Sequence, residues 1–375
     1  MSRKKAVVAM SGGVDSSVAA ALLVEAGYDV TGIMLKLWSG EAANNDSGCC
    51  NLNAAEDARR VADALDIRFY VLNFAERFER TVIADFHADY AAGRTPNPCV
   101  RCNQWVKFGE LMRRADALEA DVLATGHYAQ SVYRAGRYRL LRGKDPRKDQ
   151  SYVLWMLKQE ELARCLFPVG GLDKSETRAI ATELGLRTAA KAESQEICFV
   201  KGGDFDSYVG EHMPEAAAPG EIVDGAGNVL GRHRGIGRYT VGQRKGLGVS
   251  LGAPVFVTSI DARSNQVVVG DRSDLAVGGL VAHESSFTAE PPAEGTRVLV
   301  QHRAHGEVAE GRVGRTTVDR FEIGFIRPVE AVAPGQSVAI YELDNQELIG
   351  GGTITQTLPA LVARREDSPS VTAVV

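Results

Sequence analysis

The sequence predicts an α/β domain with a doubly wound, mostly parallel sheet, followed by a small central β-rich domain and a C-terminal β-barrel. Three observations support this fold class. Apolar strand-like runs alternate with helical patterns through residues 1–202, an order typical of βαβ units. Glycine becomes dense in residues 219–252. Short β-like runs then continue to residue 358 with almost no helical pattern, which favours a small barrel.

We place the domain boundaries where these patterns change. The predicted parallel-sheet domain covers residues 1–202, the glycine-rich central domain residues 203–278, and the barrel residues 279–360. The polar residues 361–375 are expected to form a disordered tail. A chain of 375 residues is long enough for two or three domains of ordinary size.

The first elements in chain order predict a βαβ unit. Residues 6–10 form an apolar run typical of a buried strand, residues 18–24 a helical pattern, and residues 28–35 a second strand. A crossover of this kind makes the two strands parallel. The alternation then continues, with helices expected at 54–65, 77–92 and 106–118 and strands at 67–73 and 121–126.

Shorter patterns follow the last of these strands. A hairpin is expected at residues 133–141 around Ala135-Gly136, and a helix should start near Asp173 and end near Gly185. Residues 191–200 are predicted to be a strand-like tail that carries Cys198. Strands are then expected at 254–258 and 266–269 in the central domain and at 297–300, 321–325 and 337–341 in the barrel.

The composition is that of a globular protein without a membrane segment. The chain is 45% hydrophobic and carries a net charge of −5, so RNA contacts would have to come from local basic patches. We find neither a signal peptide nor a run long enough to cross a membrane, and we expect a cytoplasmic protein. Six cysteines without an export signal favour metal binding or thiol chemistry over a disulfide framework.

A glycine-rich turn, Ser11–Ser17, joins the first strand to the first helix. Gly12 and Gly13 let successive backbone N–H groups point at one spot, and the helix start adds the positive end of its dipole. The serines add hydroxyl donors, while Asp15 could cap the helix or help to hold a metal ion beside a phosphate. The turn therefore predicts an anion site, although neither the Walker nor the G-x-G-x-x-G pattern is present. The alternative is an ordinary capped turn.

Cys99 and Cys102 form the sharpest cysteine pattern, C-x-x-C. It is compatible with half of a zinc or iron–sulfur site completed by Cys49 and Cys50, with a redox pair, or with a single catalytic thiol. A redox pair lacks its usual helix start here, because Pro98 and the next two residues predict a loop.

Two further cysteines stand alone. Cys198 has no neighbour in the sequence with which it could act, so its simplest interpretation is a small buried hydrophobe. Cys165 fits that interpretation better, because Leu162, Leu166 and Phe167 surround it.

The glycine-rich turn resembles the pyrophosphate loop, SGGxDS, of the ATP pyrophosphatase superfamily, whose members split ATP between the α- and β-phosphates and adenylate a substrate oxygen. Further motifs follow in one order over nearly the whole chain: GRTPNPCVRCN, ATGHY, KDQSYVL, SQEICFV, VGQRKGLG and PGQSVAIY. Together they resemble the tRNA-specific 2-thiouridylase family. The resemblance implies that the first domain is of the adenine nucleotide alpha hydrolase-like type.

The resemblance also implies an activity. Members of the family use ATP, as its Mg²⁺ complex, to adenylate the C2 oxygen of the wobble uridine (U34) of tRNA and replace it with sulfur. Adenylation is needed because a uracil carbonyl oxygen is a poor leaving group. By this resemblance Cys198 carries the sulfur as a persulfide and Cys102 is the nucleophile that forms a transient disulfide with it. The terminal sulfur either attacks the activated carbon directly or is freed when Cys102 attacks the persulfide. At least one of the two thiols should then have a lowered pKa.

The remaining site residues follow from the same motif matches. The implied ATP contacts are Ala9, Met10, Ser11, Gly12, Gly13, Val14, Asp15, Ser16, Leu35 and Gly126. Asn97, Pro98 and Cys99 match the segment that touches the target base, and His127, Lys148, Asp149, Gln150, Gln301, His302 and Gln336 match tRNA contacts. Many relatives have an acidic residue at the position of Cys99, so a general-base carboxylate is missing there.

The implied partners are the anticodon loop of tRNA and a sulfur-donor protein, either a cysteine desulfurase or a sulfur-relay carrier. Basic glycine-rich runs at 232–234 and 238–245 are candidates for phosphate contacts. We expect a monomer with no metal ion and no permanently bound cofactor. Two alternatives stay open: another SGGxDS enzyme, such as an amidating or tRNA lysidine synthetase, and a metal-clustered RNA-binding protein that uses the cysteines as ligands.

Overall fold

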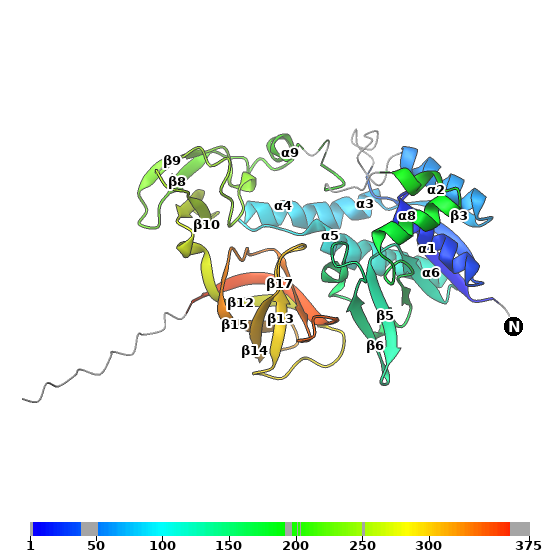
Figure 1. Ribbon diagram of the computed structural model, residues 1–375. Helices are drawn as coiled ribbons and strands as arrows, with labels where there is room; N and C mark the ends of the chain where they lie inside the picture. Colours follow the sequence, from blue (N-terminus) through cyan, green and yellow to red (C-terminus); the bar gives the residue numbers. More distant parts are fainter. Residues whose placement is uncertain are drawn as a thin grey trace, which may run out of the picture.

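The computed structural model describes six parts of the chain: residues 3–38, 52–191, 197–200, 202, 204–249 and 252–360. The loop with Cys49 and Cys50, and the tail predicted at 361–375, lie outside the described residues. In Figure 1 the parallel-sheet domain, the central domain and the barrel are arranged around one long helical segment, which runs from α3 (Ala75–Phe78) to α4 (Ala84–Ala91).

A five-stranded parallel sheet forms the centre of the first domain, as predicted. Its strand order is β3-β2-β1-β4-β7, and every pairing is parallel. The strands are β1 (Lys5–Ala9), β2 (Asp29–Lys36), β3 (Arg68–Asn73), β4 (Val122–Thr125) and β7 (Cys165–Leu166). Reversal of the strand order at β1 leaves the carboxyl ends of β1 and β4 side by side, where doubly wound sheets bind ligands.

Helices cover both faces of this sheet, which is why its central strands read as continuous apolar runs. Alternate residues of β1 point to opposite faces: Ala6 and Val8 pack in one core cluster and Val7 in another. The first cluster includes residues of α1 (Val14–Glu25), α2 (Leu52–Ala64) and α8 (Lys174–Glu183), and the second includes residues of α3–α4 and η3–α6.

The second cluster is built on two long helical segments. One runs without interruption through α3 (Ala75–Phe78), the π-turn η2 (Glu79–Ile83) and α4 (Ala84–Ala91). The other runs through α5 (Pro98–Arg101), the π-turn η3 (Cys102–Glu110) and α6 (Leu111–Ala117). The predicted start of this second helix at residue 106 is wrong by eight residues, because Pro98 opens the helix. Proline suits the first helical position, where no N–H is needed.

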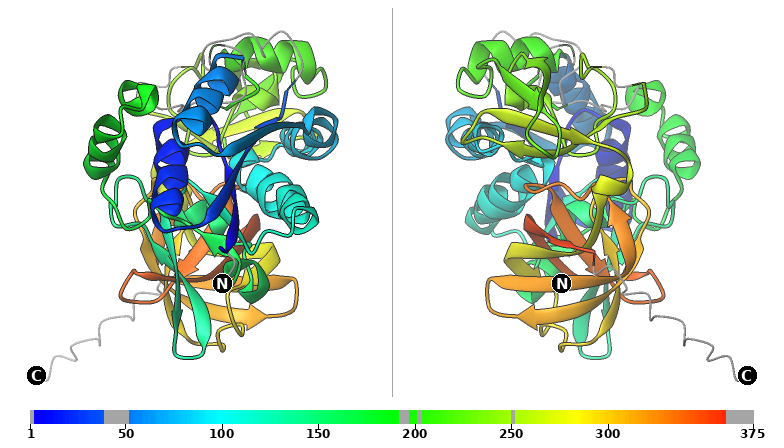
Figure 2. Two further views of the ribbon diagram at one scale, coloured as in Figure 1. Left: turned by 90° about the vertical axis from the view of Figure 1, so that its right-hand side faces the viewer. Right: turned by 90° about the vertical axis from the view of Figure 1, so that its left-hand side faces the viewer.

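The predicted hairpin is present but belongs to another sheet. Strands β5 (Ala129–Arg134) and β6 (Arg137–Arg142) are joined by Ala135 and Gly136, both with positive φ, as a two-residue hairpin turn requires. Strand β6 pairs with β17 of the C-terminal barrel through Leu141 and Glu347. The first domain thus adds two strands to the third, and Figure 2 shows this hairpin beside the barrel.

A closed six-stranded barrel forms the C-terminal domain, as predicted. The order β12-β15-β14-β13-β16-β17 closes through antiparallel pairing of β12 with β17. Its strands are β12 (Ala276–Phe287), β13 (Arg297–Gln301), β14 (Ala309–Thr316), β15 (Arg320–Glu330), β16 (Ser337–Tyr341) and β17 (Glu347–Pro359). Fully buried side chains such as Leu280, Phe321 and Ile354 fill its interior.

The central domain has a helix, α9 (Phe205–His212), and a four-stranded sheet of order β10-β11-β8-β9. Its strands are β8 (Gly220–Val223), β9 (Val229–His233), β10 (Phe256–Asp261) and β11 (Gln266–Gly270). Short helical turns complete the described chain: η4 (Ser151–Leu154), α7 (Gln159–Leu162), η5 (Arg187–Ala190), η7 (Ile236–Arg238) and η8 (Ser273–Leu275). None of the helices in the described ranges has the length and apolar character needed to cross a membrane.

Candidate active site

The glycine-rich turn is held in shape mainly by its own residues. Gly13 is the N-cap of α1, and the Ser11 amide donates to Ser16 Oγ at 3.1 Å while Ser17 Oγ donates to the Gly13 carbonyl at 2.8 Å. Gly12 has a φ of +71°, and a Cβ on it would lie 2.2 Å from the Ala54 carbonyl oxygen. Only glycine fits there. The turn therefore presents its backbone and the exposed Ser11 at the carboxyl end of β1, whereas Ser16 and Ser17 are buried and bond to the Gly13 carbonyl.

Asp15 does not cap α1; it receives two groups from elsewhere in the chain. Lys174 Nζ lies 2.6 Å and 2.8 Å from its two carboxylate oxygens, and the Tyr128 hydroxyl donates to Oδ1 at 2.8 Å. The capping interpretation fails because Asp15 is the second residue after the N-cap and its side chain is drawn towards Lys174.

Two lysines that sequence reasoning missed therefore border the turn. Lys174 begins α8, and Lys191 Nζ lies 3.1 Å from the Gly12 carbonyl oxygen and 2.8 Å from Asp57 Oδ2. The capping box at Asp173 shows where α8 starts, but it does not show that Lys174 reaches across to the first helix. Each of the two ammonium groups beside the glycine turn is paired with an aspartate, Lys174 with Asp15 and Lys191 with Asp57.

Gly126, a predicted ATP contact, lies against the start of α1 in the same turn. A Cβ on Gly126 would be 2.7 Å from both the Asp15 carbonyl carbon and the Ser16 amide nitrogen. Leu35, the predicted adenine-side contact, is buried one residue before the end of β2. The predicted ATP residues thus gather at the carboxyl ends of β1, β2 and β4.

His127 is enclosed in the protein rather than displayed on its surface. Its Nδ1 lies 2.7 Å from Thr125 Oγ1, and its ring packs between Phe108 and Phe167 at centroid distances of 6.0 Å and 6.2 Å. Burial, followed by the nearby Lys107 charge, holds the pKa of His127 well below its usual range. The ring is therefore neutral at neutral pH.

The C-x-x-C segment begins a helix. Asn97 is the N-cap, with Oδ1 accepting from the Val100 amide at 3.3 Å, and Pro98 occupies the first helical turn. The predicted loop is wrong, and the argument drawn from it against a redox pair falls with it. Cys99 is exposed, whereas Cys102 is 8% exposed at the point where the π-turn begins. Such π-turns are frequent at functional sites.

Cys198 lies in a turn, not in the predicted strand, because the Val200 amide donates to the Ile197 carbonyl at 3.0 Å. Its neighbour Phe199 packs edge-on against Phe86, with ring centroids 5.1 Å apart, and against Tyr208 at 5.6 Å. Burial and the charge of the Cys198 thiolate raise the pKa of Tyr208.

Both proposed thiols contact the same core cluster, but this cluster extends through all three domains, so the shared cluster does not by itself bring the two sulfurs together. Cys102 is buried in the cluster built on α3–α4, and Cys198 is partly buried against that cluster. None of the four described cysteines forms a disulfide, and Cys165 is buried in β7 with a raised thiol pKa, as expected for a structural cysteine.

Several predicted tRNA contacts are engaged within the protein. Asp149 is buried, accepts from the Gly143 and Ser151 amides at 3.0 Å and 3.1 Å, and pairs with Arg142. Arg142 also donates to Gln301 Oε1 at 3.0 Å. This buried network joins the hairpin to the barrel. Lys148 is half-buried at the same turn.

The other three predicted tRNA contacts also lie in packed surroundings. Gln150 Oε1 accepts from the Tyr128 amide at 3.0 Å. Burial lowers the pKa of His302 to about 4, and its Nδ1 has no partner in the described chain. Gln336 Nε2 donates to the Thr95 and Pro96 carbonyls at 3.0 Å and 3.1 Å. Gln336 therefore supports the residues directly before Asn97.

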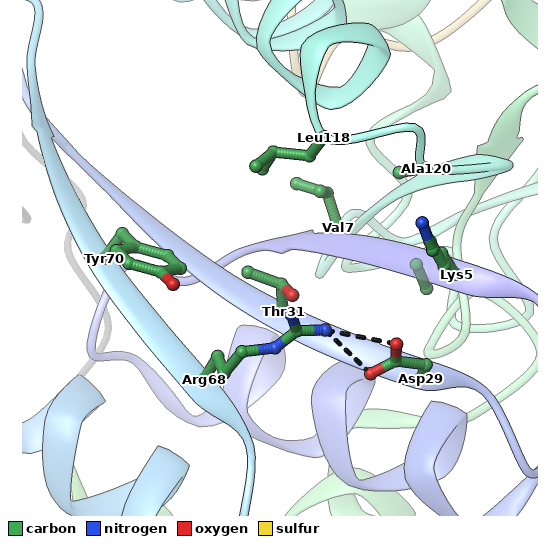
Figure 3. A pocket seen from close by; sticks show the side chains of 9 residues that line it. Lys5, Val7, Asp29, Thr31, Arg68, Tyr70, Leu118 and Ala120 are labelled. Atoms are coloured by element: carbon green, nitrogen blue, oxygen red, sulfur yellow. Dashed lines mark hydrogen bonds and ion pairs between the residues drawn. The ribbon is translucent and has the colours of Figure 1, made fainter.

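A groove at the opposite end of the sheet is separate from these residues. Figure 3 shows Val7, Thr31, Tyr70 and Leu118 around it, with Arg68 paired to Asp29 at 2.9 Å and 3.1 Å. Lys5, Asp29 and Arg68 begin their strands, so the groove lies at the amino ends of the strands. It therefore lies at the end of the sheet opposite the predicted nucleotide contacts.

Comparisons with known proteins cover the whole architecture. A family model described as tRNA methyl transferase HUP domain matches residues 4–202. One described as tRNA methyl transferase PRC-barrel domain matches residues 206–271, and one described as aminomethyltransferase beta-barrel domain matches residues 277–354.

Similar curated proteins include three named tRNA-specific 2-thiouridylase MnmA. That of Geotalea uraniireducens is 48% identical over 358 residues, 94% of this chain and 95% of the relative. That of Moorella thermoacetica is 49% identical, covering 93% and 98%, and that of Clostridium perfringens is 46% identical, covering 96% and 100%. Among solved structures, an RNA complex of a 4-thiouridine synthetase with bound ATP is 17% identical, covering 56% of this chain and 51% of that chain, with a TM-score of 0.36.

Proposed function

The chain belongs to the tRNA-specific 2-thiouridylase family, and from that premise we propose that it converts the wobble uridine of tRNA to 2-thiouridine with consumption of ATP. The sequence identity of 46–49% over nearly the full length of the relatives supports this proposal. In the proposed reaction AMP is transferred to the C2 oxygen, pyrophosphate is released, and a persulfide sulfur then displaces AMP.

The glycine-rich turn supports the proposed ATP site. Its backbone N–H groups and the start of α1 favour a triphosphate, and two lysine ammonium groups, each paired with an aspartate, lie beside it. The pair of Asp15 with Lys174 would keep this ammonium group in place before the nucleotide arrives. We expect ATP to enter as its Mg²⁺ complex, with the adenine towards Leu35.

The sulfur transfer that we propose uses Cys198 and Cys102 in sequence. The terminal sulfur of a Cys198 persulfide attacks C2, and AMP leaves with the oxygen and its bonding electrons. The Cys102 thiolate then attacks Cys198 Sγ, so that the S–S bond breaks, the new sulfur stays on C2 and a Cys102–Cys198 disulfide remains. An external thiol must reduce this disulfide before the next cycle.

The proposed partners follow from the same chemistry. A cysteine desulfurase or a sulfur-relay carrier would load Cys198, which lies in an incompletely buried turn. A wobble base in a single-stranded loop can be turned out into a pocket without breaking a duplex. We propose that the protein acts as a cytoplasmic monomer on such loops.

A single assay tests the proposal. The protein is incubated with ATP, Mg²⁺, a persulfide donor and unmodified tRNA, and 2-thiouridine, AMP and pyrophosphate are measured. We expect Cys102→Ser and Cys198→Ser to reduce thiolation by roughly a hundredfold or more while ATP cleavage continues. Cys165→Ala is the control, because Cys165 is a buried structural cysteine in β7 with a raised thiol pKa.

Other outcomes would contradict parts of the proposal. Thiolation that survives both serine substitutions removes the cysteine roles, and ADP in place of AMP removes the assignment of the glycine-rich turn. Incorporation of a labelled methyl group, as the wording of two family models suggests, would favour methyl transfer instead. Stoichiometric zinc or iron that is lost in Cys99→Ser would favour a metal-clustered protein.

A further inference from the structure

A buried arginine stands directly before the proposed nucleophile. The side chain of Arg101 is only 9% exposed, and its guanidinium donates in three directions. Nε lies 3.1 Å from Asp85 Oδ2, Nη1 3.1 Å from Gln104 Oε1, and Nη2 2.6 Å from Glu284 Oε2. The guanidinium also lies 4.9 Å from the centre of the Trp105 ring. A planar cation held in this way has little freedom to rotate.

One of the three acceptors comes from the barrel. Glu284 is 183 positions away from Arg101 and belongs to β12. Its φ is +53°, in the left-handed region, at an irregularity where the pairing of β12 with β17 shifts between His283 and Ser286. Residues other than glycine rarely adopt this conformation, and it persists where the surroundings demand it. The bulge turns the Glu284 carboxylate towards the catalytic domain.

A second contact fixes Glu284 on its own domain. The Thr353 hydroxyl of β17 donates to Glu284 Oε2 at 3.0 Å, the same oxygen that accepts from Arg101. The carboxylate is therefore held between the barrel wall and the helix that carries Cys102. The side chain of Glu284 is 47% exposed, whereas that of Arg101 is 9% exposed. The barrel thus supplies the acceptor for Nη2 of this buried guanidinium.

The residue after Cys102 is anchored as well. Asn103 is 1% exposed, and its Nδ2 donates to the Val153 carbonyl at 2.9 Å. The barrel also packs closely on this region, because Ser286 Oγ donates to the Met156 carbonyl at 3.1 Å. Cys102 thus lies between two residues that are each held by hydrogen bonds from distant parts of the chain.

We propose that Glu284 is a positioning residue for the Cys102 thiol: through Arg101 the barrel fixes the first turn of η3 and with it the direction of the sulfur. Without Glu284, Asp85 and Gln104 would still accept from the guanidinium, but both belong to the catalytic domain, and Glu284 adds the connection to the barrel. With Glu284 in place, Arg101 is held at both ends. The part of the proposal that concerns sulfur transfer rests on the proposed function, while the part that concerns the thiol's surroundings does not.

The experiment compares Glu284→Ala and Glu284→Gln with Glu330→Ala in the full-length protein. Glu330 is the matched control, because it is also a glutamate of the barrel that pairs with an arginine, Arg272. Both side chains of this pair are exposed, and both residues are far from the cysteines in the sequence. The first measurement is the rate at which iodoacetamide alkylates Cys102, followed by peptide mass analysis. The second is kcat for thiolation, with the KM for ATP and the melting temperature.

We expect Glu284→Ala to speed the alkylation of Cys102 by roughly threefold or more, because the helix turn opens more often. Thiolation should slow by about tenfold at an unchanged KM for ATP, since misplacing a reacting group costs rate rather than nucleotide binding. Glu284→Gln keeps a hydrogen-bond acceptor and should recover most of the rate. Glu330→Ala should leave both measurements unchanged.

The outcomes separate the two proposals. Equal alkylation and equal kcat in Glu284→Ala and Glu330→Ala would overturn the positioning role. A lower melting temperature with unchanged alkylation of Cys102 below the transition would also overturn it, because domain docking alone explains that result. Faster alkylation in a protein that forms no 2-thiouridine would contradict the proposed function and leave the positioning role supported.

Discussion

The glycine-rich turn Ser11–Ser17 and the thiol segment Asn97–Asn103 are held in place by different means. The turn forms its main hydrogen bonds within seven residues, such as that from Ser11 to Ser16. The thiol segment is held from far away: by Gln336 before it, and by Glu284 and Val153 within it. The glycine-rich turn is thus stabilised mainly by hydrogen bonds among its own residues. The thiol segment is stabilised in part by hydrogen bonds from the barrel domain.

This difference has a consequence for how the two sites respond to change. A substitution in the turn acts where it is made, because few distant contacts can compensate for it. A substitution in the barrel can change the surroundings of the thiol without touching the thiol itself. Packed interfaces transmit such shifts, since closely packed side chains have few alternative arrangements.

The largest effect is expected from Gly12→Ala, which breaks the turn locally. The new Cβ would lie 2.2 Å from the Ala54 carbonyl oxygen at a φ of +71°. We expect a loss of roughly 3 kcal/mol or more in the free energy of unfolding, from overlap added to backbone strain, and loss of ATP cleavage. Gly27→Ala, at a φ of +84° with open space around it, isolates the strain and should cost about 1–2 kcal/mol. Equal costs in urea unfolding would contradict the steric argument.

A smaller effect is expected from Lys174→Ala, which tests the long-range ion pair between Asp15 of the turn and Lys174. Asp15 and Lys174 are both largely buried, with side chains 30% and 11% exposed. Removing the lysine leaves a carboxylate unpaired and should lower the free energy of unfolding by about 2 kcal/mol. The control is Lys144→Ala. Lys144 is exposed and pairs with Glu176 of α8, the helix that begins at Lys174, and its removal should lower the free energy of unfolding much less. If Lys174→Ala and Lys144→Ala have the same free energy of unfolding, the pair of Lys174 with Asp15 does not stabilise the protein more than an exposed ion pair does.

Gln336→Ala tests the barrel's hold on the thiol segment. The loss of two hydrogen bonds to the Thr95 and Pro96 carbonyls should cost about 1–2 kcal/mol of stability. If Gln336 acts by positioning, kcat for thiolation should fall more than the affinity for tRNA. Gln356→Ala, an exposed glutamine of the same barrel, is the control. A weakened tRNA affinity with unchanged kcat would instead favour direct tRNA contact.

The smallest effect concerns His127, whose ring connects the end of β4 to Phe108 of the thiol helix. Its folded-state pKa lies well below the 6.5 of an unperturbed histidine. The unfolded chain therefore binds the proton first, and stability should fall as the pH drops below that value. Melting temperatures measured from neutral pH to about pH 5 should decrease less in His127→Gln than in the unchanged protein. Parallel curves would show that this ring does not titrate as described.

Sequence reasoning succeeded where the physical signal is local. The alternation of apolar runs predicted the parallel sheet, and the glycines and serines of Ser11–Ser17 predicted the turn and its place between β1 and α1. It failed at Pro98, where two closely spaced prolines suggested a loop although one of them opens a helix capped by Asn97. It also missed Lys174 and Lys191, because nothing near either residue in the sequence shows what its ammonium group reaches.

The sequence by itself determined the order of the domains, the glycine-rich turn and the family to which the chain belongs, because periodicity, turn chemistry and motifs are properties of neighbouring residues. Only the tertiary structure decided that Asp15 pairs with Lys174, that the hairpin extends the barrel, and that Glu284 reaches Arg101 beside Cys102. These contacts join residues more than a hundred positions apart. Their geometry depends on how whole domains pack, and no local pattern encodes that.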